Sequence, residues 1–151
     1  MRMAIRSAVS GIQKSEGGPF GACLVKNGKV IATAHNRVLK NKDATCHAEI
    51  NAIRLASKKL RTYDLSGCVI YSTTEPCPMC FSAIHWACLD RVIYGTSIKD
   101  VQRRGFNELS IPSRTMKKLG KSKVKITARF RRKECLNLLK AWDNLPSKQT
   151  Y

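Results

Sequence analysis

Long apolar runs are missing from this chain of 151 residues. No run approaches the roughly 20 residues that cross a bilayer. The basic N-terminal segment, residues 1–15, also lacks the apolar stretch of a signal peptide. We therefore expect a cytoplasmic protein without a membrane partner. Repeats, low-complexity tracts and Gly/Ser-rich linkers are absent too, so residues 1–151 are predicted to form a single domain.

Acidic residues are scarce: 10 Asp and Glu stand against 28 Lys and Arg, which gives a net charge of +18. Hydrophobic residues make up 43% of the chain, an ordinary globular content that argues against disorder. Much of the basic excess falls between residues 99 and 133. Such a field attracts polyanions, so nucleic acid such as tRNA is a candidate partner. A solvated basic surface is the alternative, because no aromatic residues interleave with these charges.

Disulfide pairing is not indicated, because the seven cysteines are odd in number and no export signal precedes them. Cys23, Cys68 and Cys88 lie in apolar runs and are expected to be small core residues. Cys77 and Cys80 differ from these. A C-x-x-C pair in a reducing compartment indicates metal binding or redox chemistry.

The apolar periodicity predicts an α/β fold. Asn27-Gly28 is a strong hairpin signal, and Thr45 is expected to cap the helix that follows it. The segment after residue 95 is expected to be irregular, with at most one helix. Strands that alternate with helices in the second half imply parallel pairing, with helices on both faces of the sheet. The predicted helices cover residues 3–14, 46–60, 77–88 and 133–142, and the predicted strands cover residues 20–26, 30–36, 68–72, 91–95 and 124–130.

Four residues form a constellation typical of catalytic zinc. His47, Cys77 and Cys80 offer one imidazole and two thiolates, which leaves the fourth position of a zinc ion for water. Glu49 follows His47 too closely to share its helical stripe, so it is expected to flank the metal and transfer protons. A structural zinc site would need a fourth ligand, and Cys46 is poorly placed for that role. A thioredoxin-like redox pair would leave His47 and Glu49 unexplained.

The chain resembles the cytidine/nucleobase deaminase superfamily, and within it the bacterial guanine deaminase branch. The H-A-E and P-C-x-x-C elements belong to the whole superfamily. The G-G-P-F segment at residues 17–20, the A-I-x-W-A segment at residues 83–87 and the final tyrosine favour guanine deaminase over tRNA adenosine deaminase. The resemblance implies a three-layer α/β/α sandwich around a five-stranded mixed sheet. It also implies a homodimer in which residues 131–151 can be exchanged between subunits.

The same resemblance assigns roles to individual residues. It implies one Zn²⁺ per chain, with a bound water, and Glu49 as the catalytic proton carrier. Phe20 and Trp86 would pack on the purine, Asn36 would bind its edge, and Glu108 and Tyr151 would contact the base or its amine. The implied reaction is hydrolysis of guanine to xanthine and ammonia. The implied substrate-binding set is Phe20, Asn36, Ala48, Trp86, Glu108 and Tyr151.

Several alternatives stay open at this level. Glu108 stands where guanine deaminases of this kind have an aspartate, which could reshape the pocket for guanosine. Cytosine and a tRNA adenosine are further candidate substrates. Core packing would also explain Phe20 and Trp86, a turn cap would explain Asn36, and a frayed end would explain Tyr151. A non-catalytic binding module is disfavoured by the intact Glu49.

Overall fold

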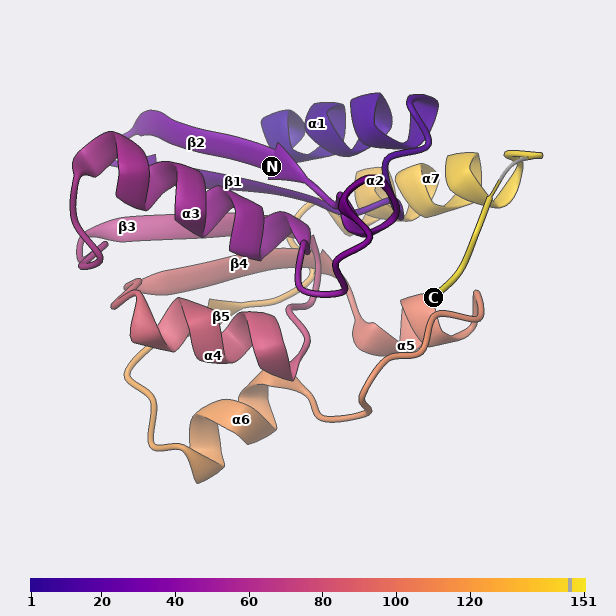
Figure 1. Ribbon diagram of the computed structural model, residues 1–151. Helices are drawn as coiled ribbons and strands as arrows, with labels where there is room; N and C mark the ends of the chain where they lie inside the picture. The colour runs from indigo at the N-terminus through magenta and orange to yellow at the C-terminus, as the bar shows by residue number, and fades with distance from the viewer. Residues whose placement is uncertain (147) are drawn as a thin grey trace.

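A five-stranded mixed sheet lies between two layers of helices (Figure 1). The computed structural model describes residues 1–146 and 148–151. The strand order is β2-β1-β3-β4-β5; β1 is antiparallel to β2 and β3, whereas β3, β4 and β5 run parallel. The predicted fold class and the parallel second half are therefore confirmed. The strands are β1 Gly21–Lys26, β2 Lys29–His35, β3 Cys68–Thr74, β4 Arg91–Thr96 and β5 Lys125–Thr127.

The helices divide between the two faces of the sheet. The helices α3 and α4 share one core with the sheet, and α1 packs with α7 in a second core on the opposite face. Within the described residues, no helix combines the length and apolar character needed to span a membrane. The helices are α1 Arg2–Gln13, α2 Val38–Asn41, α3 Ala48–Leu60, α4 Pro78–Trp86, α5 Ile98–Gln102, α6 Ser113–Leu119 and α7 Arg132–Asp143.

Two glycines explain why the outer layers lie so close to the sheet. A Cβ on Gly21 would stand 2.0 Å from the carbonyl oxygen of Ala4 in α1, and a Cβ on Gly95 would stand 2.2 Å from Sγ of Cys135 in α7. No side chain fits at either position. The hairpin between β1 and β2 turns at Asn27-Gly28, where both φ angles are positive, as predicted.

The structure corrects several sequence expectations. The strand expected over residues 124–130 ends at Thr127, because Arg129 and Arg131 take positive φ angles of 62° and 51° that interrupt the regular pairing, although the amide of Phe130 still binds the carbonyl oxygen of Tyr94 at 2.9 Å. Thr45 does not cap α3; its hydroxyl binds the carboxylate of Asp43 instead.

The basic segment after β4 holds two helices, α5 and α6, instead of at most one. Among the cysteines assigned to the core, Cys23 and Cys68 are buried, but Cys88 is exposed. It follows α4 with a φ angle of 56°, at the point where the chain turns away from the helix.

Candidate active site

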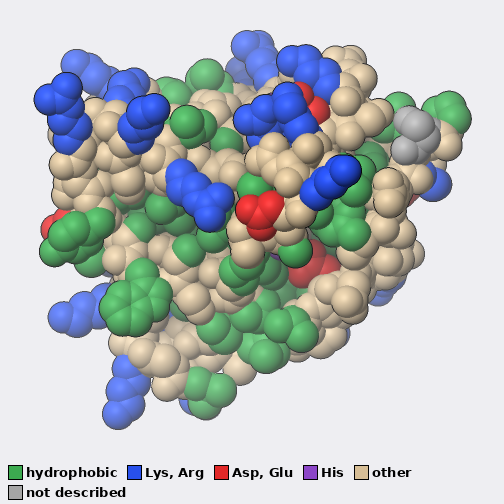
Figure 2. Space-filling model, viewed as in Figure 1, with side chains coloured by type: hydrophobic (Ala, Val, Ile, Leu, Met, Phe, Trp, Pro, Cys, Tyr) green, Lys and Arg blue, Asp and Glu red, His purple; other side chains and the backbone are tan. Residues whose placement is uncertain are grey.

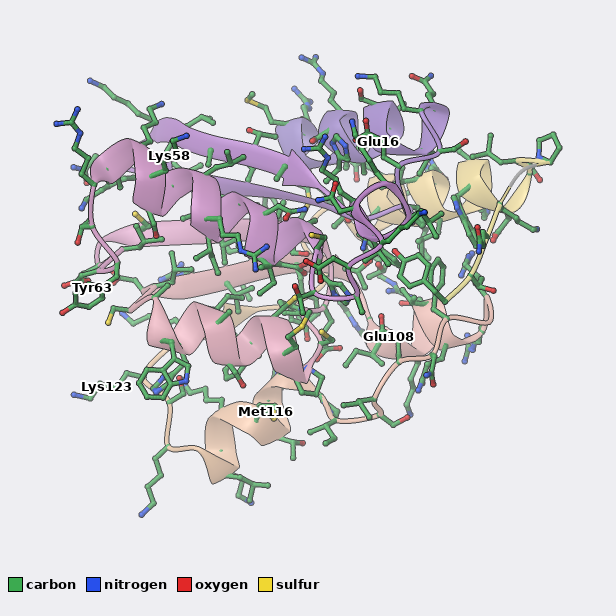
Figure 3. The ribbon with its side chains drawn as sticks, in the orientation of Figure 1. Glu16, Lys58, Tyr63, Glu108, Met116 and Lys123 are labelled. Atoms are coloured by element: carbon green, nitrogen blue, oxygen red, sulfur yellow. The ribbon has the colours of Figure 1, made fainter. Side chains whose placement is uncertain are left out.

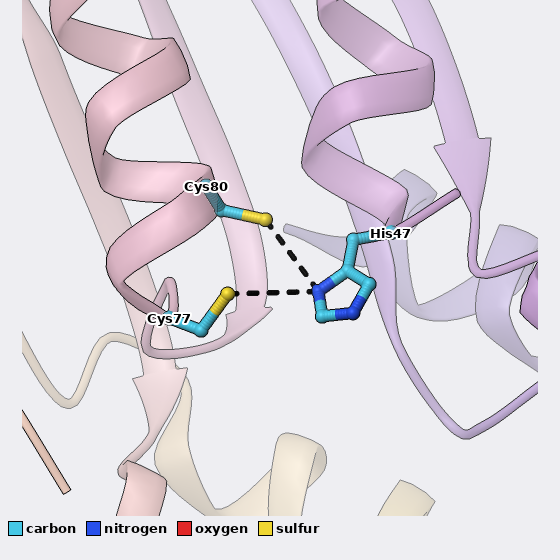
Figure 4. A group of neighbouring side chains, drawn as sticks. All are labelled: His47, Cys77 and Cys80. Atoms are coloured by element: carbon cyan, nitrogen blue, oxygen red, sulfur yellow. Dashed lines mark hydrogen bonds between the residues drawn. The ribbon is translucent and has the colours of Figure 1, made fainter. Parts of the chain in front are cut away.

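The metal-site residues lie where two helices begin. His47 is the N-cap of α3 and Cys77 is the N-cap of α4, each with extended backbone angles, and Cys80 lies in the first turn of α4. Figure 4 shows the two helix starts facing each other with the three side chains between them. Free amides and the helix dipole at such ends favour thiolates. Pro78 opens α4 at a position where no backbone N–H is needed.

The three donor atoms fit a zinc ion. The Nδ1 atom of His47 lies 3.7 Å from Sγ of Cys77 and 3.6 Å from Sγ of Cys80, and all three ligand atoms lie within 4.8 Å of one another. Tetrahedral zinc, with bonds of about 2.3 Å to sulfur and about 2.0 Å to nitrogen, would separate sulfur from nitrogen by roughly 3.5 Å. The side chains are therefore already spaced for this ion.

The two thiols respond to each other before any metal binds. Hydrogen bonding from Cys80, followed by hydrogen bonding from His47, lowers the pKa of Cys77 to about 4. The pKa of Cys80 is raised, because its thiol donates to Cys77 and because it is buried. One negative charge is thus favoured at the site in the metal-free chain. A divalent cation would stabilise the second thiolate as well.

Glu49 lies beside the three ligands without belonging to them. Its side chain is buried, and its Oε1 accepts a 2.8 Å hydrogen bond from the hydroxyl of Ser72 in β3. Its Oε2 lies 3.5 Å from Sγ of Cys80. Burial raises the pKa of Glu49. A carboxylate with a raised pKa next to a metal site suits a group that takes up and returns a proton.

A cavity of about 330 Å³ opens over the metal site. Figure 2 shows acidic side chains within a recess on this face of the molecule, and Figure 3 labels Glu108 beside α5. The floor carries His47, Glu49 and Cys77, and the walls include Phe20, Glu108 and Tyr151.

Glu108 is the second carboxyl group of this cavity. Burial, and next to it the charge of Cys77, raises the pKa of Glu108 to about 7. Because the group is half-buried and faces the metal site, it can accept a hydrogen bond from a base as a carboxylate. The aspartate expected from the family pattern is thus replaced by a longer side chain that still reaches the cavity.

Asn36 and Tyr151 are joined at the edge of the cavity. Asn36 is 1% exposed, and its Oδ1 accepts hydrogen bonds from the amide of Val38 at 3.1 Å and from the hydroxyl of Tyr151 at 2.6 Å. Its Nδ2 finds no partner among the described residues. Asn36 therefore caps a turn and also keeps a buried donor free, and such a donor is costly unless a ligand accepts from it.

Tyr151 is docked rather than frayed. Its carbonyl oxygen accepts a 3.1 Å hydrogen bond from the amide of Asn107, and its hydroxyl accepts one from the amide of Gly18 at 3.1 Å. The ring lies edge-on to Phe106, with the ring centroids 5.5 Å apart. The C-terminal residue thus closes the cavity of its own chain.

The structure does not bring Trp86 to this cavity. Trp86 ends α4 and is 79% exposed. At 1.5 Å per residue, nine residues of helix place it on the order of 12 Å along the axis from the metal end. Ala48 is fully buried as the first residue of α3, and its side chain does not line the cavity.

Sequence reasoning gave no role to Phe106, although it organises the cavity wall. Its ring centroid lies 5.0 Å from that of Phe20, 4.9 Å from that of Trp142 and 5.5 Å from that of Tyr151. The signal was an aromatic residue two positions before Glu108. Glu75 was also missed as a lining residue.

Comparison with known proteins agrees with this geometry. Residues 1–96 match the family described as the cytidine and deoxycytidylate deaminase zinc-binding region. This chain belongs to that family. The guanine deaminase of Bacillus subtilis (strain 168) is 38% identical over all of this chain and 96% of its own length. A tRNA-specific adenosine deaminase of Buchnera aphidicola subsp. Schizaphis graminum is 34% identical, over 92% of this chain and 88% of its own length.

Solved structures extend the same likeness to the fold. A guanine deaminase from Nitrosomonas europaea superposes with a TM-score of 0.86 at 31% identity, over 95% of this chain and 84% of that one. A chain from a study of tRNA:A34 deaminases superposes with a TM-score of 0.80 at 30% identity, over 92% of this chain and 97% of that one. The chain is therefore a zinc-dependent hydrolytic deaminase of this family.

Proposed function

We propose that this deaminase converts guanine to xanthine and ammonia. The observation that carries the proposal is the closure of the cavity by Tyr151, which bonds to Asn36 and to the amide of Gly18. A cavity of about 330 Å³ with a docked tail suits a free base better than a base still attached to a polynucleotide. A related structure, 32% identical over 93% of this chain with a TM-score of 0.84, holds 8-azaguanine, which supports a purine base.

The residues divide the work as follows. His47, Cys77 and Cys80 would hold one zinc ion per chain, which when bound makes water acidic enough to act as a nucleophile at neutral pH. Phe20 and Phe106, whose rings meet edge-to-face, form the apolar wall against which the base packs. This leaves the polar edges of the base for the remaining side chains.

Proton transfer falls to Glu49. Its carboxylate takes one proton from the attacking water and gives it to a ring nitrogen as the oxygen adds at carbon 2 of guanine. It then takes the second proton from the added hydroxyl group and gives it to the amine, so that the carbon–nitrogen bond breaks and ammonia departs. Ser72 holds the other carboxylate oxygen at 2.8 Å and so fixes the direction of transfer. The free Nδ2 of Asn36 donates to an acceptor on the purine edge, and the Glu108 carboxylate accepts from its N–H groups.

A homodimer is the proposed assembly. The exposed Trp86 at the end of α4 and the exposed Leu119 at the end of α6 leave apolar surface on the side of these two helices. On the face shown in Figure 2, this lower region carries more apolar than basic side chains. Such surface is typical of a subunit contact. Exchange of residues 131–151 between subunits stays a prediction, since in the single chain Tyr151 lines its own cavity.

Adenosine deamination in tRNA is the second candidate. The net charge of +18 and the likeness to tRNA-specific deaminases support it. Binding to a polyanion would fade steeply as salt rises, whereas turnover of a neutral base would not.

The test is ammonia release by the zinc-loaded protein, with guanine, guanosine, adenine, cytosine and unmodified tRNA compared at two salt concentrations. We expect guanine to be the preferred substrate, with little dependence on salt. Turnover of tRNA alone, declining as salt rises, would replace the guanine proposal with the tRNA one.

A further inference from the structure

A second cavity opens at the edge of the sheet where β5 stops early. β5 pairs only with Arg91–Ile93 of β4, so the end of β4 continues without it. The cavity has a volume of about 470 Å³, and buried Tyr94 and Gly95 form part of its lining. It is distinct from the catalytic cavity, because the two share no lining residue.

Three arginines from three elements line this second cavity. Arg114 belongs to α6, Arg129 to the turn after β5, and Arg132 is the first residue of α7. Arg129 is directed there by its positive φ angle of 62°, the same backbone turn that ends β5. The arrangement is therefore built by the fold and does not come from one flexible segment.

Among the described residues, acidic ones balance the charge of only one of these three arginines. Arg132 makes two hydrogen bonds to Asp100, at 2.6 and 2.9 Å, which fix its guanidinium and offset its charge. Within the described part of the chain, Arg114 and Arg129 form no ion pair, and no Asp or Glu lines the cavity. Glu75 lies behind Tyr94, where it accepts from the amide of Ser113 at 3.0 Å. An excess of positive charge thus faces a concave site that is open to solvent, with Arg114 and Arg129 exposed at its rim.

The chemistry of the lining selects the ligand class. Guanidinium groups bind phosphate oxygens in a planar, two-bond geometry and are the preferred side chains for this purpose. α7 begins at this cavity without a side-chain cap, and the free amides of its first turn add to the attraction for anions. A concave site of this volume is large enough to receive a small molecule.

We propose that the pocket lined by Arg114, Arg129 and Arg132 binds a small phosphorylated ligand of the pyrophosphate or nucleoside diphosphate class. The site would give the chain a second small-molecule ligand besides its base substrate. It is independent of the proposed substrate, because none of its lining residues lies in the catalytic cavity.

The test is calorimetric titration of the zinc-loaded protein with inorganic pyrophosphate at constant ionic strength, with zinc content checked before and after. We expect about one ligand per chain. The double variant Arg114→Gln/Arg129→Gln should weaken binding about 100-fold, since each charged hydrogen-bonding group contributes roughly tenfold. The matched control, Lys58→Gln/Lys123→Gln, removes the same charge at exposed residues outside the pocket (Figure 3) and should change binding less than about threefold.

Equal weakening in the control would overturn the proposal, because it would show that net charge alone attracts the anion. Absence of pyrophosphate binding, with tRNA binding that depends on Arg114 and Arg129, would overturn it in favour of a nucleic-acid surface. If the variants fail to fold, ³¹P NMR on the wild-type protein still tests the proposal. Binding should broaden the ³¹P resonance of pyrophosphate up to one equivalent per chain. Sodium chloride at equal ionic strength should not displace the pyrophosphate and sharpen this resonance. Displacement by chloride would overturn the proposal.

Discussion

The hydroxyl of Tyr151 donates a 2.6 Å hydrogen bond to Oδ1 of Asn36, a residue 115 positions earlier in the sequence. This bond ties the C-terminal tail to the end of β2. It also fixes the amide of Asn36, so that Nδ2 keeps its orientation. Under the proposed function, the tail and the amide would act together in holding the base.

Replacing Tyr151 with Phe should raise KM for guanine at least about tenfold, because both hydrogen bonds of its hydroxyl are lost, the one to Oδ1 of Asn36 and the one from the amide of Gly18. The effect on kcat should be smaller, since the variant leaves the metal ligands and Glu49 in place. Steady-state ammonia release measures both parameters. Tyr63→Phe is the matched control, because Tyr63 is 80% exposed. An unchanged KM in Tyr151→Phe would show that the tail does not contribute to base binding.

Glu49→Gln should lower kcat by about 10²- to 10⁴-fold, which is the range that proton transfer by a positioned side chain contributes. Zinc content should stay near one per chain, because Glu49 lies outside the group of three ligands. Cys77→Ser should instead lose the metal. Metal analysis by atomic emission, run beside the activity assay, separates the two outcomes. Full activity in Glu49→Gln would refute the assigned role.

The pH profile of guanine turnover should carry the signature of Glu108. Burial raises the pKa of Glu108 to about 7 in the metal-free chain, and a bound zinc ion would lower it again by its charge. Guanine binding needs Glu108 in its carboxylate form, so kcat/KM should rise with pH through an apparent pKa at or below about 7. In Glu108→Gln this limb should be absent. A limb that persists unchanged in the variant would assign the titration to another group.

Acid stability should depend on Glu16. Hydrogen bonds from His35 and Lys40, at 2.8 and 2.6 Å, lower the pKa of Glu16 from 4.5 to about 2. Since the folded pKa lies below the unfolded one, this stabilisation is fully present above about pH 4.5 and is lost as pH falls toward 2. Glu16→Gln should cost about 1–3 kcal/mol in the free energy of unfolding at pH 7.

The difference in the free energy of unfolding between wild type and Glu16→Gln should become smaller as urea unfolding is repeated at decreasing pH. Both proteins lose zinc in acid, so the contribution of zinc cancels in the difference between their free energies of unfolding. Glu134→Gln serves as control, since its pair with Arg131 is at the surface and should contribute less than about 1 kcal/mol. A difference that stays constant with pH would show that Glu16 is not the stabilising acid.

The metal site could be predicted from the sequence because its chemistry is local. His47, Glu49, Cys77 and Cys80 lie at the starts of two helices whose apolar periodicity was visible, so their convergence needed only the parallel packing of those helices. Trp86 could not be placed, because apolar spacing does not distinguish a core residue from one on an exposed helix end. The wall formed by Phe106 was also out of reach, since it depends on packing between α5, α7 and the tail.

The end of β5 also depends on tertiary packing and not on the local sequence pattern. The alternation of residues 124–130 predicts a strand, but backbone turns at Arg129 and Arg131 end it at Thr127. Their positive φ angles follow from tertiary packing and not from local propensity, because arginine has no preference for that region. The arginine pocket that results was therefore invisible in the sequence.

The groups proposed for the reaction all come from one stretch of this chain, whereas those proposed to bind the base are divided between that stretch, with Phe20 and Asn36, and the last third. The family match ends at residue 96 and contains every metal ligand and Glu49, whereas Phe106, Glu108 and Tyr151 lie beyond it. A new substrate preference can therefore arise by rewriting the last third of the chain while the hydrolytic machinery is inherited intact. Chimeras joined just after β4 would be the natural starting point for redesigning which amine this scaffold removes.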